Sequence, residues 1–193
     1  MKKINFVFAL FIISCCGEVA AQGETRKITN EDIFVKSTFR QELVSGMNWL
    51  NSGEHYAAFG TAKGEEGKLF RYEIKTGKKV DMIFDSEELV PTGQSKPIVF
   101  KDYAFSPDES KIVFTTEVEK IYRYSTREAN YVYDLKTKKL TPLSVNGKQR
   151  LAKFSPDSKK MAFVRDNNIF MVDLESNKET QVTTDGVVNK IIN

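Results

Sequence analysis

The fold is decided by the stretch Phe105-Ser106-Pro107-Asp108-Glu109-Ser110-Lys111-Ile112-Val113-Phe114, which recurs without gaps as Phe154-Ser155-Pro156-Asp157-Ser158-Lys159-Lys160-Met161-Ala162-Phe163. The offset between the two copies is 49 residues. In each copy an aromatic residue ends a strand, Ser-Pro-Asp makes a tight turn, and a short alternating strand comes next. Each copy leads to a second signature, Tyr131-Val132-Tyr133-Asp134-Leu135 in one and Ile169-Phe170-Met171-Val172-Asp173-Leu174 in the other. The chain therefore contains an internal repeat.

A degenerate third copy precedes these two. It runs Trp49-Leu50-Asn51-Ser52-Gly53-Glu54 and continues into Leu69-Phe70-Arg71-Tyr72-Glu73-Ile74-Lys75-Thr76-Gly77. Apolar residues alternate at Ile112 and Phe114, a period of two that buries one face of a sheet. About four short strands in each unit of roughly 40 to 50 residues is typical of a β-propeller blade. We therefore predict an all-β chain with a partial propeller of three blades over residues 48–193.

Three blades leave two open flanks, because propellers usually close with about four to eight blades. The expectation is a fragment of a longer propeller. Helical periodicity is nearly absent from the mature part of the chain, and Thr29 to Arg40 is the one predicted helical turn, capped by Thr29 or Asn30.

The N-terminus has the pattern of an export signal. Lys2 and Lys3 precede an apolar run from Ile4 to Ile13 that is too short to span a bilayer. We expect a signal peptide over residues 1–21, cleaved before Gln22, then an N-terminal segment over residues 22–47. The protein would be periplasmic or extracellular. The alternative takes Ile12-Ile13-Ser14-Cys15 as a loose lipobox, with Cys15 as a lipid anchor.

Composition excludes several classes of protein. The 193 residues are 40% hydrophobic and 28% charged, with a formal net charge of +3, which gives no case for nucleic-acid binding. A single histidine, His55, limits any catalytic triad or multi-histidine metal site within the chain, and we expect it at the surface. The glycines from Gly60 to Gly67 lack the strand-to-helix context of a nucleotide loop. We expect no metal and no cofactor.

The middle unit is about ten residues longer than the last, and the excess falls in Glu117 to Glu128. Alternation within this insert predicts a hairpin arm that projects from the blade and carries Arg123. Such projecting loops are where propellers place function.

At this insert the chain resembles dipeptidyl peptidase IV, a serine exopeptidase of the prolyl oligopeptidase superfamily. The resemblance rests on Ile121-Tyr122-Arg123-Tyr124-Ser125, on Ile28-Thr29-Asn30-Glu31-Asp32-Ile33-Phe34 before the first blade, and on Asn167-Asn168-Ile169-Phe170-Met171 with the stretch from Thr184 to Asn193. It covers essentially the whole mature chain. Ser-Pro-Asp turns alone are shared by many periplasmic propellers, so the arm and the closing stretch make the resemblance specific.

The resemblance implies a bacterial enzyme that joins an eight-bladed propeller to an α/β-hydrolase domain and removes dipeptides after Pro or Ala from peptides with a free N-terminus. It assigns Arg123 to the substrate's backbone carbonyl, a task suited to a guanidinium because it stays charged and offers several fixed donors. A Trp-Val-Tyr-Glu-Glu stretch, which binds the α-amino group, would come after Asn193. Family members often form homodimers.

The chain itself has no Gly-x-Ser-x-Gly nucleophile motif, so we expect it to be inactive alone, with no catalytic residue. Its adjacent glutamate pairs, Glu65-Glu66 and Glu87-Glu88, lack the Trp-Val-Tyr context and are expected to be solvated loop charges. Two alternatives stay open. One is a non-catalytic exported propeller that binds a protein partner, and the other is a prolyl tripeptidyl peptidase relative.

Overall fold

The computed structural model describes residues 27–36, 38–39, 44–188 and 190, and it divides into two compact units, Met1–Glu42 and Leu43–Asn193. The predicted signal peptide and Cys15 lie outside the described residues. In the first unit, α1 (Asn30–Phe34) begins after Thr29, whose side chain accepts a hydrogen bond from the backbone of Asp32 while the Asp32 carboxylate bonds back to Thr29. This capping box confirms the cap predicted at Thr29, and the helix is one short turn.

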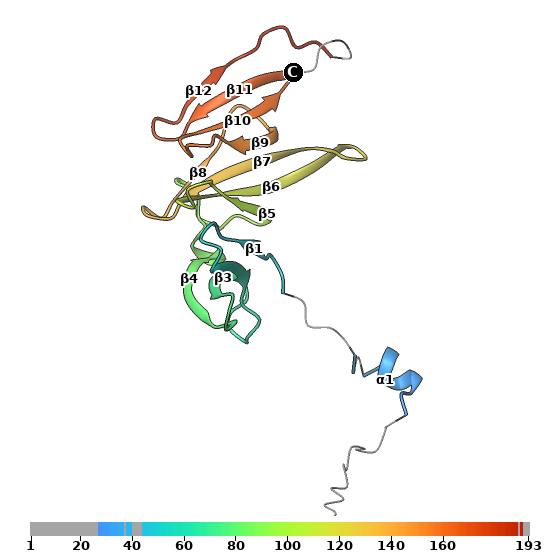
Figure 1. Ribbon diagram of the computed structural model, residues 1–193. Helices are drawn as coiled ribbons and strands as arrows, with labels where there is room; N and C mark the ends of the chain where they lie inside the picture. The colour runs from blue at the N-terminus through green and yellow to red at the C-terminus, as the bar shows by residue number, and fades with distance from the viewer. Residues whose placement is uncertain (1–26, 37, 40–43, 189, 191–193) are drawn as a thin grey trace, which may run out of the picture. The chain divides into compact units, whose positions relative to one another are not determined.

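The second unit consists of three four-stranded antiparallel sheets, here called blades 1 to 3 (Figure 1). Each blade contains four consecutive strands in simple order. Blade 1 contains β1 (Asn48–Trp49), β2 (His55–Phe59), β3 (Lys68–Glu73) and β4 (Lys79–Asp85), and the 3₁₀ turn η1 (Ser86–Glu88) comes directly after it. Blade 2 contains β5 (Phe100–Phe105), β6 (Lys111–Tyr122), β7 (Ser125–Asp134) and β8 (Lys139–Pro142). Blade 3 contains β9 (Arg150–Phe154), β10 (Lys160–Arg165), β11 (Asn168–Asp173) and β12 (Lys178–Gln181). The described chain is therefore nearly all β and has the expected architecture of a partial β-propeller.

The turn between the first two strands is the same in all three blades. The backbone bond Ser106 N to Lys111 O in blade 2 recurs as Ser155 N to Lys160 O in blade 3 and as Leu50 N to His55 O in blade 1. In each turn one residue has positive φ, namely Glu109 at 58°, Ser158 at 58° and Gly53 at 67°. The degenerate first copy is thus a true structural repeat, although it lacks the Ser-Pro-Asp sequence.

Blades 1 and 2 share the larger of two buried apolar clusters. Alternate residues of β6, Ile112 and Phe114, point into it together with Leu69 and Phe84 of blade 1. The rings of Phe84 and Phe114 meet edge to face with centroids 5.1 Å apart, a favourable aromatic geometry. The predicted period of two therefore buries this face of blade 2.

The opposite face of blade 2 is buried as well. Val113 of β6 and Val132 of β7 point into a second cluster with Met161, Phe163 and Val172 of blade 3. The prediction that the alternation buries one face is incomplete for this blade, because a sheet between two others is covered on both sides. By contrast, Trp49 on blade 1 is 65% exposed.

Turns also link successive blades. The Asn51 side chain in blade 1 donates to the carbonyl of Pro107 in blade 2 over 2.6 Å, and the backbone N–H of Asp108 donates to Ser158 Oγ in blade 3 over 3.0 Å. These bonds fix the order and spacing of the three turns independently of the apolar clusters.

Candidate functional site

The middle blade carries a long hairpin arm, formed by residues 117–128, that extends beyond the other hairpins (Figure 1). The paired strands β6 and β7 continue past Thr116 and Ala129 to the last pair, Tyr122 with Ser125. Arg123 and Tyr124 form the two-residue tip. The equivalent hairpin in blade 3 ends at the pair Arg165 with Asn168, so the predicted insert between Glu117 and Glu128 is a projecting arm.

A register shift separates the arm from the body of the blade. It falls between Thr116 and Glu119, and Glu117 has a positive φ of 46°. Such a bulge inserts unpaired residues, bends the strand and redirects the residues beyond it. The arm therefore leaves blade 2 at a defined hinge point.

The base of the arm is fastened to the chain segment that enters blade 3. Lys148 Nζ donates to the carbonyl of Glu117 and to the carboxylate of Glu119, both over 2.8 Å, and Arg127 pairs with Glu119 over 3.0 Å across the hairpin. The Lys148 hydrogen bond lowers the pKa of Glu119, and the Glu119 carboxylate raises the pKa of Lys148. Both groups consequently stay charged near neutral pH.

A buried glutamine adds a second fastening. Gln149 is almost fully buried, and its Oε1 accepts hydrogen bonds from both the backbone and the side chain of Asn130. Its backbone also pairs with that of Glu128 as an antiparallel bridge. The arm is thus held by the segment that enters blade 3 as well as by its own blade.

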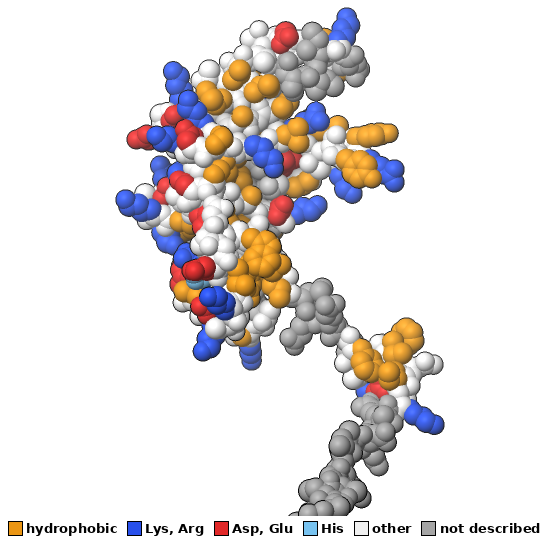
Figure 2. All heavy atoms as spheres, viewed as in Figure 1, with side chains coloured by type: hydrophobic (Ala, Val, Ile, Leu, Met, Phe, Trp, Pro, Cys, Tyr) orange, Lys and Arg blue, Asp and Glu red, His pale blue; other side chains and the backbone are white. Residues whose placement is uncertain are grey.

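The tip of the arm presents aromatic and cationic groups to solvent. Tyr122 and Tyr124 are 80% and 90% exposed, and the Arg123 guanidinium lies 5.6 Å from the centre of the Tyr124 ring. Arg123 takes part in none of the hydrogen bonds or ion pairs found among the described residues. In Figure 2, hydrophobic side chains and Lys and Arg side chains gather on this projection. The predicted residue is therefore exposed, and its hydrogen-bond donors are free.

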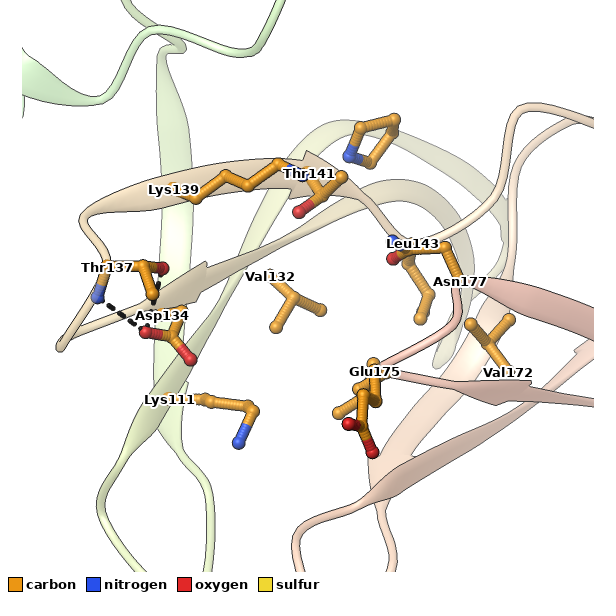
Figure 3. Close-up of a pocket in the computed structure, with 12 residues that line it drawn as sticks. Lys111, Val132, Asp134, Thr137, Lys139, Thr141, Leu143, Val172, Glu175 and Asn177 are labelled. Carbon is orange, nitrogen blue, oxygen red and sulfur yellow. Dashed lines mark hydrogen bonds between the residues drawn. The ribbon is translucent and has the colours of Figure 1, made fainter.

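A cavity lies at the end of β6 and β7 that is opposite to the arm. It has a volume of about 280 Å³ and is lined by Lys111, Asp134 and Glu175 (Figure 3). The Asp134 carboxylate already accepts bonds from the backbone and hydroxyl of Thr137. Because Lys111 pairs with Asp134 at the end of the β6 and β7 pair that is opposite to the tip, this cavity is separate from the arm.

His55 and the two adjacent glutamate pairs are not part of the arm. His55 begins β2 in blade 1, is partly exposed, and lies 3.3 Å from Ser52 Oγ through Nδ1. Glu65 forms an ion pair with Lys79, and Glu87 and Glu88 lie in η1. Neither glutamate pair forms a site with Arg123.

Sequence reasoning missed Lys148 and Gln149. The one available signal is their position, directly before the first strand of the third repeat and after the turn residues Asn146 and Gly147. Among the described residues no group of three or more His, Cys, Asp or Glu is placed to hold a metal ion. Within the same part of the chain, no helix is long and apolar enough to cross a membrane.

Comparison with known proteins gives a consistent result. Residues 106–193 match the family described as "Dipeptidyl peptidase IV (DPP IV) N-terminal region". The probable dipeptidyl-aminopeptidase B of Pyrenophora teres f. teres is 27% identical over 179 residues, covering 86% of this chain and 19% of that protein. The probable dipeptidyl peptidase 4 of Aspergillus clavatus is 36% identical over 103 residues, covering 52% of this chain and 13% of that protein.

The crystal structure of Porphyromonas gingivalis dipeptidyl peptidase 4 has the same arrangement. It superposes with a TM-score of 0.65 at 34% identity, covering 87% of this chain and 23% of that chain. The chain thus spans less than a quarter of the length of each of these three relatives.

Three successive four-stranded antiparallel blades, the middle one with a long arm, define part of a β-propeller. The family match, the relatives and the superposed structure identify the chain more narrowly, as an N-terminal propeller portion of a dipeptidyl peptidase IV-like peptidase.

Proposed function

We propose that this chain supplies substrate recognition to a dipeptidyl peptidase IV-like serine exopeptidase, and that Arg123 binds the backbone carbonyl of the peptide. The observation that carries the proposal is the tip of the arm, where the guanidinium of Arg123 has no hydrogen bond or ion pair among the described residues. A guanidinium with free donors is suited to carbonyl oxygens, and it stays charged at any working pH.

The anchoring of the arm supports this role. A loop that must be ordered when the ligand binds loses affinity to conformational entropy, whereas a pre-ordered one does not. Lys148 and Gln149 order the base of the arm in the absence of a ligand. The arm therefore presents Arg123 as a preorganised group.

The chain is assigned recognition and gating, and no catalytic residue. We place the hydrolytic step in another part of a longer protein, with substrates that have a free N-terminus and Pro or Ala as the second residue. The relatives named above are dipeptidyl peptidases, which supports peptides as the substrates.

The test is peptide turnover by the longest natural product of the gene. Wild-type protein should release p-nitroaniline from Gly-Pro-p-nitroanilide, and Arg123→Ala should lower kcat/KM by tenfold or more, because a charge-assisted hydrogen bond is worth about 1.5 to 3 kcal/mol. Lys120→Ala, an exposed change on the same arm, should stay within about twofold of wild type. Turnover unchanged by Arg123→Ala, or absent from the wild type, would contradict the proposal.

Export is part of the proposed role. We propose that residues 1–21 direct the chain out of the cytoplasm and are then removed. N-terminal sequencing of protein recovered outside the cytoplasm should begin at Gln22. A start at Cys15 would support the lipid-anchored alternative instead, and a start at Met1 would contradict cleavage.

A further inference from the structure

A second cavity, of about 330 Å³, opens beside the base of the arm. Its walls are formed by Ile121 and Arg127 of the arm, by Lys148 and Arg150, and by Arg165 and Asp166 at the tip of the β10–β11 hairpin. We call this cavity the basic recess, because four cationic side chains and one acidic one line it. Its volume lies in the common range for ligand pockets, about 300 to 1,000 Å³.

Three of the four cations already have acidic partners. Arg127 pairs with Glu119 over 3.0 Å, Lys148 pairs with the same carboxylate over 2.8 Å, and Arg165 pairs with Glu179 over 2.6 Å. These pairs fasten the arm and the hairpin, so their charges are largely compensated within the chain.

Arg150 is different. Its side chain is partly exposed in the basic recess, yet its Nε is shielded from water and has no hydrogen-bond partner. Because water does not reach this Nε, a ligand in the recess would meet the two terminal nitrogens of the guanidinium, for which no hydrogen bond or ion pair is found among the described residues. The guanidinium keeps its charge at any working pH, and the two oxygens of a carboxylate accept parallel N–H bonds from it.

We propose that the basic recess binds a carboxylate of a peptide ligand, and that Arg150 is the residue that selects for it. The choice of a peptide rests on the function proposed above, because the recess adjoins the arm that carries Arg123. Ile121 supplies an apolar wall suited to the methylene groups of a glutamate side chain. The carboxylate can belong to an acidic side chain or to the C-terminus of the ligand, and the two sources are separable.

The test observes Arg150 directly in the 193-residue chain. The Nε–Hε signal of Arg150 is identified in a ¹H–¹⁵N spectrum by its loss in Arg150→Lys. Gly-Glu-Gly-amide should shift this signal and bind about tenfold more tightly than Gly-Gln-Gly-amide, the effect of one charge-assisted hydrogen bond. Gly-Gln-Gly with a free C-terminus tests the second source, and a response to it alone assigns the site to C-terminal carboxylates.

A matched pair of variants supplies the control. Arg150→Gln should abolish the preference for a carboxylate. Arg71→Gln should preserve it, because Arg71 lies in β3 of blade 1, where its Nε forms an ion pair with Asp81 over 3.3 Å. Equal binding of all three peptides, an unmoved Arg150 signal, or equal effects of the two variants would overturn the proposal.

These outcomes are separable from failure of the proposed function. The Arg150 measurement needs no turnover. An Arg150 signal that does not shift on addition of the peptides therefore contradicts carboxylate binding in the basic recess, whatever the turnover of Arg123→Ala. Turnover that persists in Arg123→Ala overturns the proposed function, whatever the Arg150 signal does.

Discussion

The Ser-Pro-Asp turn is stabilised by a compact set of side-chain bonds. In blade 2, Ser106 Oγ donates to the Asp108 carboxylate over 2.6 Å and accepts the backbone N–H of Lys111 over 2.9 Å. In blade 3, Ser155, Asp157 and Lys160 repeat both bonds. The residues that revealed the repeat in the sequence are therefore the ones that close the turn.

Asp108 makes this turn sensitive to acid. The Ser106 hydroxyl, with the backbone and hydroxyl of Ser110, holds the pKa of Asp108 well below its usual range. A carboxyl with a lowered folded-state pKa adds stability above its unfolded pKa of about 3.9, and that stability is lost as pH falls through the folded value. Denaturant unfolding of the wild-type chain should show a free energy of unfolding that falls below about pH 4. Below this pH the free energy of unfolding of Asp108→Asn should depend less on pH than that of the wild type. Equal pH dependence in the two proteins would contradict the role given to Asp108.

Gln149 is predicted to be the most costly polar residue to remove near the arm. Gln149→Ala leaves the Asn130 amide donors without their acceptor in a buried site, at a cost of about 1 to 3 kcal/mol in the free energy of unfolding. Gln181→Ala, at an exposed glutamine in β12, should cost less than about 0.5 kcal/mol. Chemical denaturation compares the two, and equal losses would show that Gln149 does not anchor the arm.

At the scale of the element, the arm shows what sequence can and cannot predict. Its existence was predictable from the length difference between repeats, and its tip at Arg123 from local alternation. The bulge at Glu117 was not predictable, because it depends on the register of β6 against β7. The fastening by Lys148 was not predictable either, because Lys148 contacts residues 29 and 31 positions earlier in the chain. A lysine in a turn-rich, charged sequence has no local signature of such a contact.

Lys148 is expected to control the mobility of the arm. Lys148→Ala removes the bonds to Glu117 and Glu119, so backbone amides of the arm should exchange with deuterium several-fold faster. Lys153→Ala, an exposed lysine in β9, is the matched control and should leave the rates unchanged. Hydrogen exchange measured by mass spectrometry distinguishes them, and an arm equally protected in both variants would count against the fastening.

For the molecule as a whole, the repeat predicted the all-β architecture and the number of blades. It left the burial of both faces of blade 2 unpredicted, because alternation within one strand shows that faces differ and cannot show what covers them. Val113 and Val132, on the face opposite Phe114, complete the contact with blade 3. The basic recess was also unpredicted, since its cations look like ordinary surface charges until blades 2 and 3 are packed together.

The central claim, that Arg123 binds the backbone carbonyl of a peptide, is tested most directly by a double cycle of substrate and protein. Gly-Pro-p-nitroanilide is compared with its analogue in which sulfur replaces the glycyl carbonyl oxygen, a weaker acceptor, on the wild-type gene product and on Arg123→Ala. Sulfur replacement should lower the kcat/KM of the wild type several-fold to tenfold, whereas it should hardly change the kcat/KM of Arg123→Ala. The coupling free energy between Arg123 and the glycyl carbonyl should therefore be about 1 kcal/mol or more. Equal losses in the two proteins would contradict the claim, because they would show that Arg123 and the carbonyl act independently.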